Sequence, residues 1–111
     1  MISGYRLMWM MVMFDLPVVE ADDRRAAAKF RKFLENEGFL MSQFSVYAKY
    51  CGVREKTTSI RKKIERNIPD KGKVSIILFT DKQFGDIIHL YNREKKKSKT
   101  SPDQLMLFTE D

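Results

Sequence analysis

The stretch from Leu7 to Phe14 most constrains the fold, because its eight apolar residues contain no Gly or Pro and end at Asp15. Eight residues are short for a helix and suit a strand buried on both faces, which means a central strand of a sheet. Side chains alternate along a strand, so Asp15 shares a face with Trp9 and Met13. Two interpretations of Asp15 stay open. It closes the strand by accepting loop N–H bonds, or it holds a metal ion from a rigid element.

The region after this strand predicts a helix and then β structure. A helix is expected from near Arg24, capped by Asp22 or Asp23, with Gly38 as its stop. Residues 39–50 are rich in aromatic and β-branched side chains and predict two short strands or one bent strand. Within them, core packing is the default expectation for Phe44 and Val46.

The second half of the chain repeats this alternation. A helix is predicted at about 54–66, a strand at 73–80, and a short helix, with a further short strand as an option, at 81–92. The order is that of an α+β, ferredoxin-like βαββαβ antiparallel sheet with two helices on one face. Residues 1–92 are expected to form this domain. Residues 93–111 are expected to form a charged linker and a C-terminal extra strand that pairs with a dimer mate or another partner.

Charge is unevenly distributed in this chain of 111 residues, whose formal net charge is +6. Residues 51–100 carry fourteen Lys and Arg against six Asp and Glu. This bias indicates a nucleic-acid partner, or else a solubilising surface. The candidate phosphate contacts are Arg24, Arg25, Lys29, Arg31, Lys32, Lys71 and Lys73.

Other residue types narrow the function classes. Cys51 has no second cysteine for a disulfide, and with His89 as the one histidine no zinc constellation is possible. The apolar run at 7–14 is too short to span a membrane, so no membrane partner and a cytoplasmic location are expected.

The segment "QFSVY" offers the Ser45 hydroxyl, an amide and aromatic rings, which suit base stacking or sheet pairing.

Four segments together resemble one known family in their order and spacing: "VMFDLP", "RRAAAKFRKFLENEGF", "QFSVYAKY" and "KVSIILFT". The family is the small CRISPR-associated subunit Cas-two, which works with the integrase subunit Cas-one. The resemblance runs from about residue 6 to residue 80 or beyond. "MFDLP" and "QFSVY" look closest to members from type II systems.

The resemblance implies a ferredoxin-like homodimer that binds double-stranded prespacer DNA between dimers of the integrase subunit. It implies that Asp15 occupies the position of the family's Mg²⁺ ligand, with the ion shared across the dimer. In members that are endonucleases, the residue at this position is catalytic. Phe14, Ser45 and Tyr47 match the family's dimer or motif positions. Phe14 stands where many relatives have Tyr, and Met41 stands where a basic residue is common.

Two hypotheses from different classes follow. The first is a homodimeric DNA-binding scaffold for CRISPR spacer acquisition, with Leu105, Met106, Leu107 and Phe108 as the partner-binding segment. The alternative is a Mg²⁺-dependent endonuclease, acting on RNA or on double-stranded DNA, with Asp15 paired across the dimer. A stand-alone RNA-binding domain is a third class.

Overall fold

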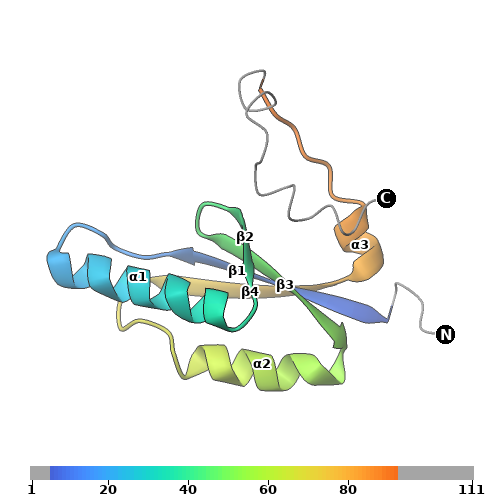
Figure 1. Cartoon of the computed structure of the whole chain (residues 1–111), viewed down its shortest axis with the longest axis horizontal. Helices are drawn as coiled ribbons and strands as arrows, with labels where there is room; N and C mark the ends of the chain where they lie inside the picture. Colours follow the sequence, from blue (N-terminus) through green and yellow to red (C-terminus); the bar gives the residue numbers. More distant parts are fainter. Residues whose placement is uncertain (1–5, 93–111) are drawn as a thin grey trace.

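The computed structural model describes residues 6–92, and its elements follow the predicted order (Figure 1). The strands are β1 (Leu7–Asp15), β2 (Leu40–Gln43), β3 (Val46–Val53) and β4 (Lys73–Thr80). The helices are α1 (Ala21–Asn36), α2 (Glu55–Glu65) and α3 (Asp81–Gly85). The predictions for the linker at 93–103, the strand at 104–109 and its residues 105–108 lie outside the described residues.

The four strands form one antiparallel sheet in the order β2-β3-β1-β4, which confirms the ferredoxin-like arrangement. β1 lies between β3 and β4, as its uninterrupted apolar sequence predicts. Figure 1 shows α1 and α2 on the same side of this sheet, and α3 beyond the end of β4. None of the helices in the described part of the chain is long and apolar enough to cross a bilayer.

One face of the sheet packs against α1 and α2 and forms the main core. β1 contributes Met10, Val12 and Phe14 to this core, each at most 8% exposed. The two helices, β3 and the connection between α1 and β2 supply further buried side chains, which are Phe30, Leu34, Phe39, Tyr47, Cys51 and Ile64. Burying a large apolar side chain contributes roughly 1.5–3 kcal/mol, so this cluster is a main source of stability.

Among residues 6–92, the other face of the sheet is covered at one end only. There Trp9 stacks on Phe84 of α3, with ring centroids 3.7 Å apart, and its indole N–H donates to Asp81 at 2.7 Å. α3 is fixed at its start by a reciprocal capping box between Thr80 and Gln83. The rest of this face, which we call the open face, carries Met11, Met13, Asp15, Leu40, Val46, Tyr50, Lys73, Ser75 and Ile77.

The start of α1 differs from the prediction. The helix begins at Ala21, and the residue at the N-cap is Glu20, whose side chain makes no capping bond. Asp22 and Asp23 are therefore not caps but lie inside the first turn, where their charges favour the positive end of the helix dipole. The stop at Gly38 is confirmed, with φ of +94°, a left-handed conformation that glycine adopts without cost.

The turn between β2 and β3 corrects another expectation. Phe44 is 80% exposed at this turn, whereas core packing was the expectation from its aromatic character. Ser45 adopts a φ of +64°, which marks a tight turn that strand periodicity does not reveal. Of the two alternatives for residues 39–50, two short strands is the one observed. No strand occurs among residues 86–92 of the described chain.

Candidate functional site

Asp15 is the last residue of the central strand and is exposed to solvent. Its backbone pairs with Lys73, the first residue of β4, so both side chains project from the open face. Residues directly opposite on an antiparallel pair have Cβ atoms about 4.5–5.5 Å apart. The strand end therefore carries an acidic and a basic side chain at neighbouring positions of one face, but their charged groups do not form an ion pair.

The residue before Asp15 faces the opposite way. The Phe14 ring is buried on the helix side, where it packs edge-on against Phe30 and stacks on Tyr47 at centroid distances of 5.2 and 5.8 Å. The Phe14 N–H donates to the Ser45 carbonyl at 3.1 Å, which fixes the β2–β3 turn beside Asp15. Phe14 and Tyr47 thus pack against the strand end from the helix side of the sheet, and both rings are buried.

Two buried groups on the helix side are unsuited to acid–base chemistry at neutral pH. Burial raises the pKa of the Tyr47 phenol, the nearby Glu35 carboxylate adds to the rise, and Arg31 opposes it. Burial also raises the pKa of the Cys51 thiol, against opposing effects of the Lys49 cation and the Met10 backbone N–H. Both groups stay protonated, so Cys51 is no candidate nucleophile.

Three of the predicted phosphate contacts have protein partners. Arg24 donates to the carbonyls of Val18 and Val19 at 3.2 and 2.7 Å and so braces the loop after β1. Arg25 pairs with Asp22 within the first turn of α1, and Lys71 pairs with Asp23 at 3.4 Å. All three side chains are engaged within the protein, and the charges of Arg25 and Lys71 are partly neutralised.

The remaining four predicted contacts differ in exposure. Lys29 and Lys32 are exposed on α1, Lys73 is exposed at the open face, and Arg31 is half-buried. Within residues 6–92, none of these four takes part in an ion pair. The two α1 lysines are therefore the freest cations of the predicted set, and Lys73 is the one beside Asp15.

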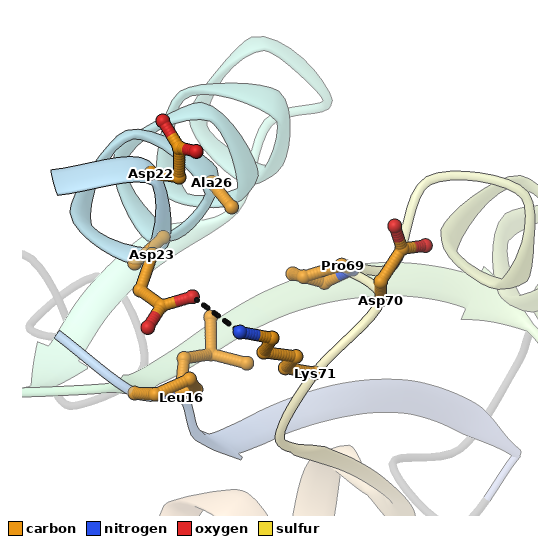
Figure 2. Close-up of a pocket in the computed structure, with 9 residues that line it drawn as sticks. Leu16, Asp22, Asp23, Ala26, Pro69, Asp70 and Lys71 are labelled. Carbon is orange, nitrogen blue, oxygen red and sulfur yellow. Dashed lines mark ion pairs between the residues drawn. The ribbon is translucent and has the colours of Figure 1, made fainter. Parts of the chain in front are cut away.

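A pocket of about 260 Å³ lies next to this strand end, between the start of α1 and the α2–β4 loop (Figure 2). Its apolar wall includes Leu16 and Pro69, and its polar lining is Asp22, Asp23, Asp70 and Lys71. Figure 2 shows the Lys71 ammonium directed at Asp23 across the pocket. Three carboxylates against one ammonium make the pocket unfavourable for phosphate.

A metal ion at the open face would depend on Asp15. Mg²⁺ is commonly bound by one or two carboxylates together with water and substrate phosphate. Among residues 6–92, no group of three or more His, Cys, Asp or Glu side chains is placed to hold a metal. One chain therefore supplies half of such a site, and Lys73 beside it lowers the local negative charge. The residues fit Mg²⁺ where a second copy or a phosphate supplies the other oxygens.

Sequence reasoning missed two features of this region. Phe44 protrudes at the turn adjoining the strand end, and Gly72 lies against the backbone of Asp15. The glycine in the turn sequence "DKGK" was a signal that could have been followed, because a glycine just before a strand often marks a close approach of two backbones.

Comparison with known proteins gives matches along most of the chain. A family model described as CRISPR associated protein Cas2 matches residues 8–87. The CRISPR-associated endoribonuclease Cas2 of Paracidovorax avenae is 45% identical over 108 residues, which cover 97% of this chain and 100% of the relative. The proteins of the same name from Flavobacterium psychrophilum and Streptococcus mutans are 37% and 41% identical. They cover 96% and 91% of this chain and 93% and 92% of their own length.

Proposed function

Because this chain belongs to the CRISPR-associated Cas2 family, we propose that it is a homodimeric scaffold for spacer acquisition, which joins integrase subunits and holds double-stranded prespacer DNA. The observation that carries the proposal is the apolar character of the open face. An antiparallel sheet with one face in water normally carries polar residues there. Here Ile77, Tyr50 and Leu40 are 48%, 45% and 39% exposed on that face.

A second copy of the chain suits this face because the face carries both an acidic residue, Asp15, and a basic one, Lys73, which can pair with each other between two copies. In a two-fold contact the same patch meets itself, so residue i faces residue j and residue j faces residue i. If the two-fold axis passes near the Asp15–Lys73 pair, Asp15 of each copy lies near Lys73 of the other, and the apolar residues of the open face are buried. The same arrangement brings the two Asp15 carboxylates together.

The dimer is tested by introducing a charge on the open face. Ile77→Asp should convert a dimer into a monomer, as measured by sedimentation equilibrium. Val19→Asp is the matched control, because Val19 is 80% exposed but lies in the loop after β1. A monomeric wild type, or an Ile77→Asp protein that remains dimeric, would contradict a dimer through this face.

Duplex binding is supported by the free lysines on α1. Lys29→Glu combined with Lys32→Glu should weaken binding of a prespacer-like duplex. The slope of log K against log salt should become shallower by about 2, because two phosphate contacts are lost. Lys56→Glu with Lys62→Glu is the control, because it makes the same charge change on α2. Equal weakening by both pairs would mean that net charge, not the α1 surface, governs binding. Co-purification with an integrase subunit on the duplex tests the scaffold role itself.

The second candidate function is a Mg²⁺-dependent endonuclease, and the relatives' name, endoribonuclease, supports it. When bound at paired Asp15 carboxylates, Mg²⁺ would activate water and stabilise charge on a phosphodiester. Asp15→Asn keeps the size of the side chain and removes its charge. It should abolish Mg²⁺-dependent cleavage of RNA or duplex DNA while leaving duplex binding intact. Wild-type protein without cleavage at any Mg²⁺ concentration would end this candidate and leave the scaffold proposal standing.

A further inference from the structure

The loop between α2 and β4 comes into direct backbone contact with the end of β1. At Gly72 the chain adopts a φ of +92°. A Cβ added at Gly72 would lie 2.7 Å from the Asp15 carbonyl oxygen and 2.8 Å from Cδ2 of Leu16. Separations below 3.0 Å are essentially never seen for real Cβ atoms. The position therefore excludes a side chain on two counts, its conformation and its space.

Gly52 shows that a positive φ and a lack of space for a Cβ atom need not occur together. It also has a positive φ, of +79°, but a Cβ added there would meet nothing within 4 Å. Gly52 pairs with Met8 at the beginning of β1, whereas Gly72 contacts Asp15 at the end of the same strand. Gly38, Gly52 and Gly72 all have a positive φ among residues 6–92, and of these three only Gly72 lies against the backbone of Asp15.

The loop that carries Gly72 is held from both sides. Lys71 pairs with Asp23 of α1 at 3.4 Å, and Lys73 begins the β4 ladder opposite Asp15. Figure 2 shows this ion pair, which joins Lys71 in the loop to Asp23 on α1. Because Lys71 is exposed, its pair with Asp23 contributes at most about 1 kcal/mol. Because Lys73, the next residue, is fixed in the β4 ladder, the loop has little freedom to retreat from an added methyl group, and the strain falls on the backbone of Asp15.

We infer that Gly72 is a positioning residue for the Asp15 carboxylate. Its missing side chain lets the α2–β4 loop lie against the Asp15 carbonyl and fixes where the strand ends and the carboxylate points. This inference rests on the proposed role of Asp15 as a metal ligand. Groups that orient a metal ligand from behind change metal affinity about 10–100-fold when they are altered.

The test compares Gly72→Ala with Gly52→Ala in the full-length protein. Both variants place an L side chain at a positive φ, so both bear a similar backbone cost. Mn²⁺ is the probe, and its binding is followed by loss of the free-ion EPR signal at a temperature where both variants are folded. A second readout, independent of any metal, is the set of backbone amide resonances of Asp15 and Leu16.

We expect Gly72→Ala to weaken Mn²⁺ binding about 10–100-fold and to shift the Asp15 and Leu16 amides. Gly52→Ala should leave both unchanged. Unaltered Mn²⁺ affinity and unaltered Asp15 resonances in Gly72→Ala would overturn the inference.

Two other outcomes are also decisive. If wild-type protein binds no Mn²⁺, the metal role of Asp15 falls, and the amide shifts alone decide whether Gly72 positions it. If Gly72→Ala does not fold, Gly72→Asn and Gly52→Asn replace the pair, because Asn tolerates left-handed backbone better than Ala does. A shift of the Asp15 amide by Gly72→Asn alone supports the inference, and equal shifts by both overturn it.

Discussion

Asp15 and Lys73 lie directly opposite each other on β1 and β4, and both project from the face of the sheet that α1 and α2 leave uncovered. This pairing places the flexible Lys73 side chain next to Asp15 on the same face, without an ion pair between the two. Any ion that binds Asp15 must therefore do so against the positive charge of Lys73, and a phosphate near Asp15 meets that same charge as an attraction.

Replacing Lys73 separates these two effects. Lys73→Met should raise Mn²⁺ affinity about tenfold, since the repulsion between a divalent ion and an exposed ammonium at about 6 Å is of order 1 kcal/mol. The same change should weaken duplex binding. Calorimetric titration with Mn²⁺ and a duplex-binding assay measure the two. Lys56→Met on α2 is the control. It should leave the affinity for Mn²⁺ unchanged and should reduce the affinity for DNA only slightly. A fall in Mn²⁺ affinity in Lys73→Met would contradict the pairing argument.

The sequence predicted those parts of the fold that depend on local pattern. The eight apolar residues before Asp15 indicated a central strand, and the predicted strand at 73–80 coincides with β4. These elements are readable because hydrophobic periodicity follows from which faces are buried. The start of α1 was wrong because two aspartates suit a cap and a first helical turn equally well.

The site was less predictable because it depends on how separate segments meet. That Arg24 and Lys71 are engaged by Val18, Val19 and Asp23 follows from the fold of two loops, and no spacing along the chain encodes it. The exposure of Phe44 depends likewise on the left-handed conformation of the next residue. The place of Asp15 at the end of a buried strand was predictable, because it is a local property of the sequence.

The stacking of Trp9 on Phe84 predicts that α3 depends on one ring. Phe84→Ala removes a side chain that is 3% exposed and should lower the free energy of unfolding by about 3–5 kcal/mol. Urea denaturation followed by Trp fluorescence measures this loss. Ile88→Ala is the control, because Ile88 is 81% exposed, and its effect should stay within about 0.5 kcal/mol. Equal stability of the two variants would mean that α3 does not rely on this stack.

The Tyr47 hydroxyl is buried and has no hydrogen-bond partner among the described residues. Leaving such a group unsatisfied costs about 1–3 kcal/mol, so Tyr47→Phe should unfold with an unchanged or higher free energy at neutral pH. Unfolding in urea at pH 7 measures this difference. A loss of more than about 1 kcal/mol would show that the hydroxyl makes a favourable contact in the folded protein.

Tyr47 also predicts a pH dependence. Burial raises the pKa of its phenol above the ordinary value of 10.0, so the folded protein retains a proton that the unfolded chain releases. The resulting stability is fully present below about pH 10 and is lost as the pH rises through the folded-state pKa. Tyr47→Phe lacks this group, so its advantage over wild type should grow from pH 9 upward in urea titrations. Cys51 titrates in both proteins, and its contribution cancels in the comparison. Parallel stability curves would refute a raised pKa at Tyr47.

Arg24 and Arg25 are adjacent on α1 but have different partners, and the difference predicts different consequences of removing each. Arg24→Ala deletes the donors to the Val18 and Val19 carbonyls, so the loop after Asp15 should open more often. Limited proteolysis with elastase, which cleaves after small apolar residues, should then cut faster at that loop. Arg25→Ala removes only an exposed ion pair with Asp22 and should leave the cleavage rate unchanged. Equal rates in the two variants would mean that the loop is held by its own packing through Leu16 and Pro17, and that Arg24 is available to a phosphate.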